Sequence, residues 1–88
     1  MKIKNGFILR EVAGNFIVVP VGHKTIDFNG IVTLNKTGAF IWSILENDVT
    51  FDEIMNELQQ KFSLDYDLLK LDLNEFIEKL SLNDLLEK

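Results

Sequence analysis

The chain contains no cysteine, and only one histidine and one proline occur among its 88 residues. Without cysteine it can form neither a disulfide nor a thiolate metal site, and it has no thiol nucleophile. The single His23 cannot build a multi-histidine site, and its place in a polar stretch favours a solvated side chain. The composition therefore predicts a protein without a bound metal or cofactor.

Long apolar runs are also missing. Near the N-terminus only Phe7, Ile8 and Leu9 follow one another before Arg10, which is too short a run for a signal peptide or a membrane span. We therefore expect a cytoplasmic protein. With 47% hydrophobic residues in 88, the chain can build one core but no deep enclosed cleft, so a single domain over residues 1–88 is expected.

The first part of the chain predicts strands. Residues 7–12 and 16–21 are rich in β-branched and aromatic side chains, and the turn-forming Ala13-Gly14-Asn15 lies between them, so they should form a hairpin. Pro20 lacks an N–H and should mark the end or the exposed edge of the second strand. A third strand is expected at residues 31–34.

Helices follow, each with a start signal. Asn35 can cap a helix over about residues 36–46, which is apolar almost all round and should lie in the middle of the fold with Trp42 in its core. A stacking role for Trp42 against a ligand is the alternative. Thr50 and Glu53 have the spacing of a capping box at the start of a second helix.

The third helix carries more apolar residues than one stripe requires. Asp65 is its expected cap, and its core stripe has helical spacing: Leu69, Leu73, Phe76, Ile77 and Leu80. Leu68 and Leu71 fall outside this row, so they either line a surface groove or cover the neighbouring strand or the chain terminus. Asn83 and Asp84 should break the helix, after which residues 85–86 pack back.

Three strands followed by three helices predict an α+β, winged helix-turn-helix-like fold with a three-stranded antiparallel sheet. A small DNA-binding transcription regulator is therefore one functional hypothesis. However, the charge is divided: residues 1–45 carry +3 and residues 46–88 carry −8. The expected second helix carries Asp52, Glu53 and Glu57 against Lys61, a sum of −2, and the expected third helix, residues 65–80, sums to −3, so either would be repelled by DNA.

Carboxylates are the remaining candidates for catalysis or metal binding. Asp72 and Glu75, or Glu75 and Glu78, could approach each other across one helical turn. Such pairs are common on solvated helix faces, and no nucleophile, base or phosphate-binding loop accompanies them. The sequence therefore predicts that the protein is not an enzyme.

The strand-to-helix junction, Leu34-Asn35-Lys36-Thr37-Gly38-Ala39-Phe40-Ile41-Trp42, resembles the signature of the PqqD family. These proteins are small peptide chaperones of the pyrroloquinoline quinone pathway and founders of the RiPP recognition elements. The resemblance extends over about residues 7–86, including Ile17-Val18-Val19-Pro20 and residues 72–80. Leu73 stands where the family usually has valine, and Asn83 stands near its usual helix-ending glycine.

The resemblance implies a non-catalytic adaptor. Such a domain binds the leader segment of a ribosomally made precursor peptide and presents the precursor to a modifying enzyme, often a radical SAM protein. The leader adds as a strand to the third strand, beside the third helix. The corresponding pairing edge here is Ile31, Val32, Thr33 and Leu34, and the candidate helix wall is Leu68, Leu71, Asp72 and Glu75.

Two further expectations concern the peptide and the oligomeric state. Only alternate residues of a strand edge point their N–H outward, and the sequence leaves open which parity of residues 31–34 faces the peptide. The acidic residues Asp72 and Glu75 suggest a leader with a basic residue near its apolar anchors. A monomer is expected, with a strand-exchanged dimer as the alternative.

Overall fold

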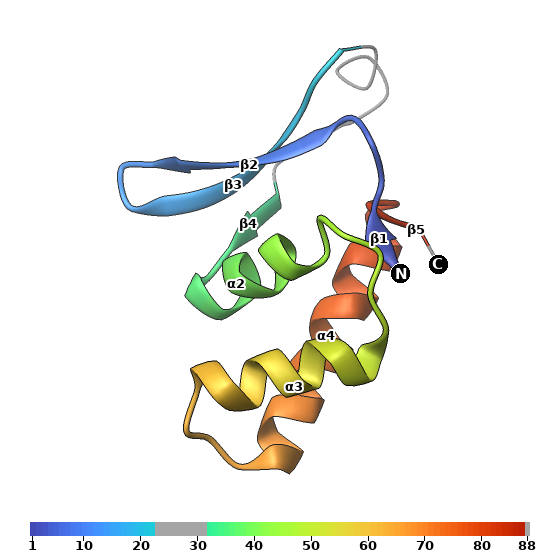
Figure 1. The fold of residues 1–88 in the computed structure, drawn as a ribbon. Coiled ribbons are helices and arrows are strands. Elements are labelled where there is room, and N and C mark those ends of the chain that lie inside the picture. Colours follow the sequence, from blue (N-terminus) through green and yellow to red (C-terminus); the bar gives the residue numbers. More distant parts are fainter. Residues whose placement is uncertain (23–31, 88) are drawn as a thin grey trace.

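The computed structural model describes residues 1–22 and 32–87 of the chain (Figure 1). Its elements are β1 (Lys2–Ile3), β2 (Phe7–Val12), β3 (Asn15–Pro20), β4 (Val32–Leu34), α2 (Lys36–Ile44), α3 (Phe51–Lys61), α4 (Tyr66–Leu82) and β5 (Leu86–Glu87). The antiparallel sheet has the order β2-β3-β4, so β4 is an edge strand. The predicted α+β, winged helix-turn-helix-like arrangement is confirmed. Ile31 and His23 lie outside the described residues.

The hairpin of β2 and β3 closes through a two-residue turn. Ala13 and Gly14 both have positive φ, 52° and 81°, and Val12 faces Asn15 across the ends of the strands. This is the backbone that a type I′ turn requires, and its twist matches that of the flanking strands. Asn15 therefore begins β3 instead of belonging to the turn. The strand ends at Pro20, as the missing N–H predicts.

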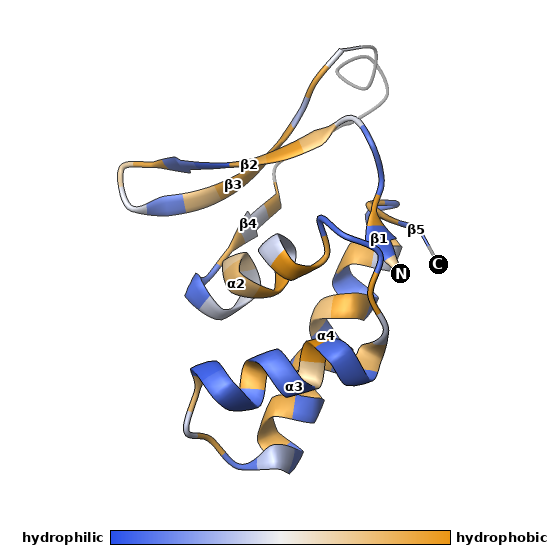
Figure 2. Cartoon of the chain, viewed as in Figure 1, coloured by the Kyte–Doolittle hydropathy of each residue, from blue (hydrophilic) through white to orange (hydrophobic). Residues whose placement is uncertain are grey.

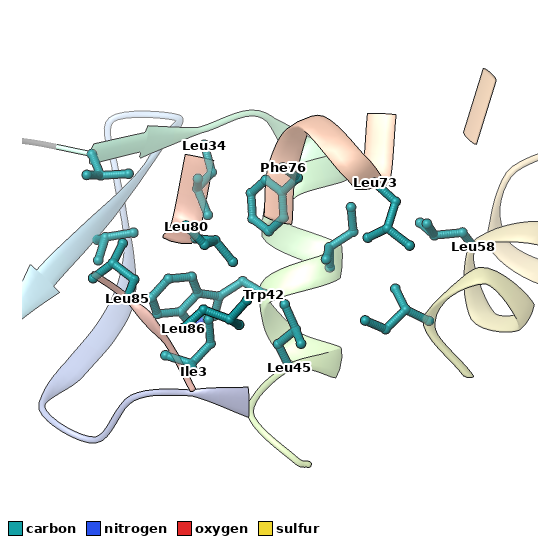
Figure 3. Packing of buried hydrophobic residues seen from close by; sticks show 14 of the residues in the cluster. Ile3, Leu34, Trp42, Leu45, Leu58, Leu73, Phe76, Leu80, Leu85 and Leu86 are labelled. Carbon is teal, nitrogen blue, oxygen red and sulfur yellow. The ribbon is translucent and has the colours of Figure 1, made fainter. Parts of the chain in front are cut away.

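Helix α2 lies between the sheet and helix α3 (Figure 1). Trp42 is only 2% exposed and packs among buried side chains from β1, β4, α4 and β5 (Figure 3). Its predicted place in the core is confirmed. The helix ends at Ile44, earlier than expected, and Leu45 at its C-cap is fully buried. By contrast, α3 and α4 alternate hydrophilic and hydrophobic residues, as amphipathic helices do (Figure 2).

A second, two-stranded sheet joins the ends of the chain and was not predicted. Lys2 pairs with Glu87 and Ile3 with Leu86, and the Ile3 N–H also donates to the Leu45 carbonyl at 2.9 Å. These contacts bring the N-terminal strand against the end of α2. The expected packing of residues 85–86 against the core is confirmed, since both leucines are buried.

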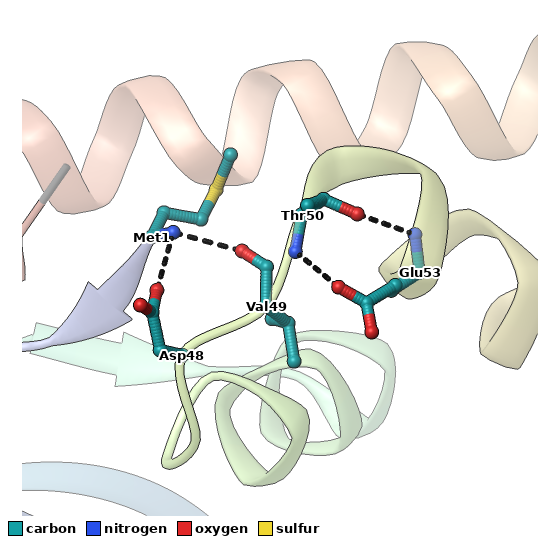
Figure 4. Close-up of polar contacts among 5 residues, drawn as sticks. All are labelled: Met1, Asp48, Val49, Thr50 and Glu53. Carbon is teal, nitrogen blue, oxygen red and sulfur yellow. Dashed lines mark hydrogen bonds and ion pairs between the residues drawn. The ribbon is translucent and has the colours of Figure 1, made fainter.

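Polar contacts fix the start of α3 (Figure 4). The N-terminal ammonium of Met1 contacts a carboxylate oxygen of Asp48 at 2.9 Å and the Val49 carbonyl at 2.8 Å. The Thr50 hydroxyl accepts from the Glu53 N–H, and the Glu53 carboxylate accepts from the Thr50 N–H. The predicted capping box is therefore present and lies directly after the segment held by the N-terminus.

Both ends of α4 lie where they were predicted, and they differ in how they are capped. Asp65 occupies the predicted N-cap position, and its carbonyl accepts the first helical hydrogen bond from Leu69 N–H at 3.0 Å, but its side chain forms no capping bond. At the other end the helix stops at Leu82 and the break falls on Asn83 and Asp84, as predicted, with Asp84 in the left-handed region at φ 57°. Asn83 keeps φ −95°, and its side-chain amide donates to the Lys79 carbonyl, so the reversal falls one residue later.

Candidate functional site

The register of the hairpin determines which main-chain groups of β3 face β4. In a two-residue hairpin the residues that flank the turn, here Val12 and Asn15, form a hydrogen-bonded pair, and such pairs alternate along the strands. Ile17 therefore directs its N–H and C=O toward β2. Phe16 and Val18 direct theirs toward β4.

The same alternation determines which main-chain groups of β4 face away from the sheet. Val32 and Leu34 lie opposite Val18 and Phe16, so they bond toward β3. Thr33 directs its N–H and C=O away from the sheet. A contact from α4 agrees with this parity, because Lys79 Nζ donates to the Thr33 carbonyl at 2.8 Å.

An open pocket of about 250 Å³ lies beside this edge, between the junction of β4 with α2 and one face of α4. Its lining residues are Leu34, Asn35, Thr37, Gly38, Ile41, Asp72, Glu75, Phe76 and Lys79. Leu34, Gly38, Ile41 and Phe76 are buried, whereas the three charged residues are exposed. The pocket therefore has an apolar base and a charged rim on α4.

Gly38 allows the two walls of the pocket to approach each other. The Asn35 side chain caps α2 by accepting from the Gly38 N–H at 2.8 Å, which confirms the predicted cap. A Cβ atom at Gly38 would lie 3.0 Å from Cε1 of Phe76 and 3.4 Å from Cβ of Leu34. The start of α2 is thus packed against α4 with no space for a further methyl group.

The charged rim is formed by one face of α4. Asp72, Glu75 and Lys79 follow one another at spacings of three and four residues, which places them side by side on a helix. Lys79 contacts Thr33 instead of either acid. Among the residues that the structure describes, neither Asp72 nor Glu75 forms an ion pair.

The structure brings some of the predicted site residues together. Thr33 and Leu34 lie on the edge, and Asp72 and Glu75 line the pocket. Leu68 and Leu71 do not line it, and they are 56% and 55% exposed. At 100° per residue, Leu68 continues the face of Asp72 by one turn, whereas Leu71 faces away from the core row.

Sequence reasoning did not find Lys79, Phe76, Gly38 or Thr37 as pocket residues. For Lys79 a signal existed, because it lies four residues after Glu75 and seven after Asp72 on the same helical face. The helical spacing of the core stripe predicts a core position for Phe76 and no role in a pocket. It is 9% exposed and serves both the core and the pocket.

Two negative findings apply to residues 1–22 and 32–87. They contain no group of three or more His, Cys, Asp or Glu side chains placed to hold a metal ion. In the same part of the chain, no helix combines the length and the apolar character that crossing a membrane requires.

Fold and site together define a small winged helix-turn-helix-like domain with an open strand edge beside a groove walled by a helix. The family model for coenzyme PQQ synthesis protein D (PqqD) matches residues 16–86. The chain belongs to the PqqD family.

Comparison with other proteins gives two further findings. The solved structure of TbiB1 in complex with the TbiA(beta) leader peptide superposes with a TM-score of 0.76 at 24% sequence identity, covering 99% of this chain and 95% of that chain. At this identity the likeness shows a shared fold. No curated protein sequence matches the chain significantly.

Proposed function

We propose that this protein is a non-catalytic adaptor that binds the leader segment of a ribosomally made precursor peptide and presents the precursor to a modifying enzyme. The observation that carries the proposal is the N–H and C=O of Thr33, which face away from the sheet on the edge of β4, directly beside the groove against α4. Membership of the PqqD family supports it. So does the shared fold with TbiB1, which was solved with a leader peptide bound.

Addition of a peptide strand would use both the edge of β4 and the groove beside it. Main-chain hydrogen bonds to Thr33 would supply affinity independent of sequence, and alternate side chains of the peptide would enter the groove and supply selectivity. Leu34 and Phe76 offer an apolar base to such a side chain. Asp72 and Glu75 would favour a leader with a Lys or Arg beside its apolar residues.

The proposal also covers the residues that flank the pocket, the oligomeric state and the partner enzyme. Ile31 and Val32 would extend the paired segment at one end of the site, and Leu68 and Leu71 would meet the leader beyond the pocket at the other. The protein would act in the cytoplasm as a monomer, without metal or cofactor. A radical SAM protein is one candidate for the modifying enzyme.

Proline substitutions in β4 test the mode of binding. The probe is a set of synthetic peptides covering the N-terminal segments of short open reading frames beside the gene. Thr33→Pro removes an outward N–H, so the variant should fold yet lose the peptide that the parent protein binds. Val32→Pro removes an N–H that bonds to β3 and should lower the melting temperature. Calorimetry and circular dichroism measure the two effects.

Leu71→Asp tests whether the peptide reaches the outer face of α4. It should weaken binding with little change in melting, because Leu71 is exposed. Affinities within about twofold of the parent, a change below roughly 0.4 kcal/mol, for both Thr33→Pro and Leu71→Asp would show that the peptide is not bound at this edge.

A further inference from the structure

Lys79 spans the gap that an added strand would have to enter. Its stem starts on α4, and its ammonium donates to the Thr33 carbonyl on the free edge of β4 at 2.8 Å. The same oxygen is the acceptor that a paired peptide strand would use. A carbonyl can accept two hydrogen bonds, but a side chain that bridges β4 and α4 lies in the path of any chain placed between them.

We propose that Lys79 is a latch that closes the β4 edge in the free protein and is displaced when the leader binds. This inference rests on the proposed function, because it concerns the same edge. It makes Lys79 a competitor of the peptide and not one of its contacts.

Glu75 can form an ion pair with the Lys79 ammonium once the peptide has displaced it from Thr33. It precedes Lys79 by four residues, and a Glu at that position N-terminal to a Lys is the favourable orientation for an ion pair on a helix. Glu75 forms no ion pair with any described residue while Lys79 is on Thr33. The ammonium therefore exchanges one acceptor for another, and the cost of opening stays small.

Closing the edge of β4 with Lys79 would protect the free protein against pairing with unrelated extended chains. Unpaired N–H and C=O groups on an edge strand attract any extended chain, and a lysine placed at such an edge blocks this pairing. Thr33 carries the outward-facing N–H and C=O of β4, and Lys79 covers the C=O. The latch therefore weakens pairing that uses the main chain alone, and a peptide that also fills the pocket offsets this small cost through its side chains.

The test compares Lys79→Met with Lys70→Met. Methionine keeps a long unbranched side chain without the ammonium. Lys70 lies nine residues before Lys79, on the opposite side of α4, so its replacement gives the same change in net charge away from the edge. The first readout needs no peptide: in nitrogen-15 spectra of the free protein, the amide of Leu34, which shares a peptide group with the Thr33 carbonyl, should shift in Lys79→Met only.

The second readout is calorimetric affinity for the leader-segment peptide that the parent protein binds. Lys79→Met should tighten binding by about threefold or more, as expected for removal of a competing hydrogen bond, and Lys70→Met should leave it within about twofold. Glu75→Gln should weaken binding more in the parent protein than in the Lys79→Met background, because the displaced ammonium then loses its second acceptor.

The outcomes separate the latch from the proposed function. Unchanged or weaker binding by Lys79→Met, with the peptide still shifting the β4 amides, overturns the latch and leaves strand addition standing. An unmoved Leu34 amide in the free variant also overturns the latch. If the peptide shifts no β4 amide in either protein, the proposed function fails, and the role of Lys79 as a competitor fails with it.

Discussion

Gly38 lets α2 approach α4 closely, because a side chain at this position would meet the Phe76 ring. It combines two roles, since its N–H is the donor to the Asn35 cap and its missing side chain leaves room for the Phe76 ring. A glycine in the first turn of a helix has no requirement for positive φ. Its presence here is explained by space, and it is the residue that lets the pocket have an aromatic base.

Gly38→Ala should therefore destabilise the protein although alanine is the better helix former. The gain in helix propensity is about 1 kcal/mol, and overpacking against Phe76 costs about 1–3 kcal/mol, so a net loss of about 1 kcal/mol is expected. Urea unfolding followed by the fluorescence of the single tryptophan measures it. A variant as stable as the parent would mean that the Phe76 ring moves aside at no cost.

Trp42→Ala should remove about 3–5 kcal/mol from the free energy of unfolding, because the whole indole is withdrawn from the core. That is a large share of the 5–15 kcal/mol typical of a domain. Thermal and urea unfolding followed by circular dichroism check the value, with Trp42→Phe as the milder control. A loss below about 1 kcal/mol would contradict the core position and return a ligand-stacking role to consideration.

At the scale of elements, the sequence predicted correctly the turns and caps that are held by interactions between neighbouring residues. The turn at residues 13–14 and the caps Asn35 and Thr50 were readable because each acts within a few residues. Strands β1 and β5 were not, since two-residue strands show no periodicity and their partners lie at opposite ends of the chain.

The site was predictable to a similar extent. The resemblance placed Thr33, Asp72 and Glu75 near one another, and Thr33 with its neighbours was expected to form an edge. Its outward parity needed the observed turn, because a turn one residue longer would have reversed it. The contact of Lys79 with Thr33 depends on how α4 lies against the sheet, which no spacing in the sequence contains.

Thr50→Ala tests the start of α3 as an element separate from the site. Loss of the hydroxyl leaves the Glu53 N–H without its acceptor and should lower stability by about 1 kcal/mol. Thr50→Ser keeps the hydroxyl and serves as the control. Since no residue of α3 lines the pocket, leader affinity should be unchanged in both variants. Urea unfolding and calorimetry provide the two measurements, and a parallel loss of affinity would tie α3 to the site.

At the scale of the whole molecule, the distribution of charge separates this protein from DNA-binding members of the same architecture. Helices α3 and α4 belong to the half of the sequence that carries −8. A recognition helix must approach phosphates, and its lysines and arginines supply most of the binding energy. The fold alone does not decide between the two uses.

The protein should therefore not bind DNA at physiological salt. Fluorescence anisotropy with duplexes of mixed sequence at roughly 150 mM salt should show no saturable binding tighter than about 1 μM, since the acidic helices repel the backbone. A basic winged-helix protein in the same assay supplies the positive control. Saturation below that concentration would overturn the charge argument.

The pairing of β1 with β5 places the entry and the exit of the fold next to each other, because Lys2 and Glu87 are partners in one short ladder (Figure 1). The first and the last strand of the domain are thus separated by one strand spacing, about 5 Å. Such a unit can be inserted into a surface loop of a host protein as readily as it can be fused to one end. A domain of this fold can consequently be carried by a larger protein as an internal module without opening the core of either part.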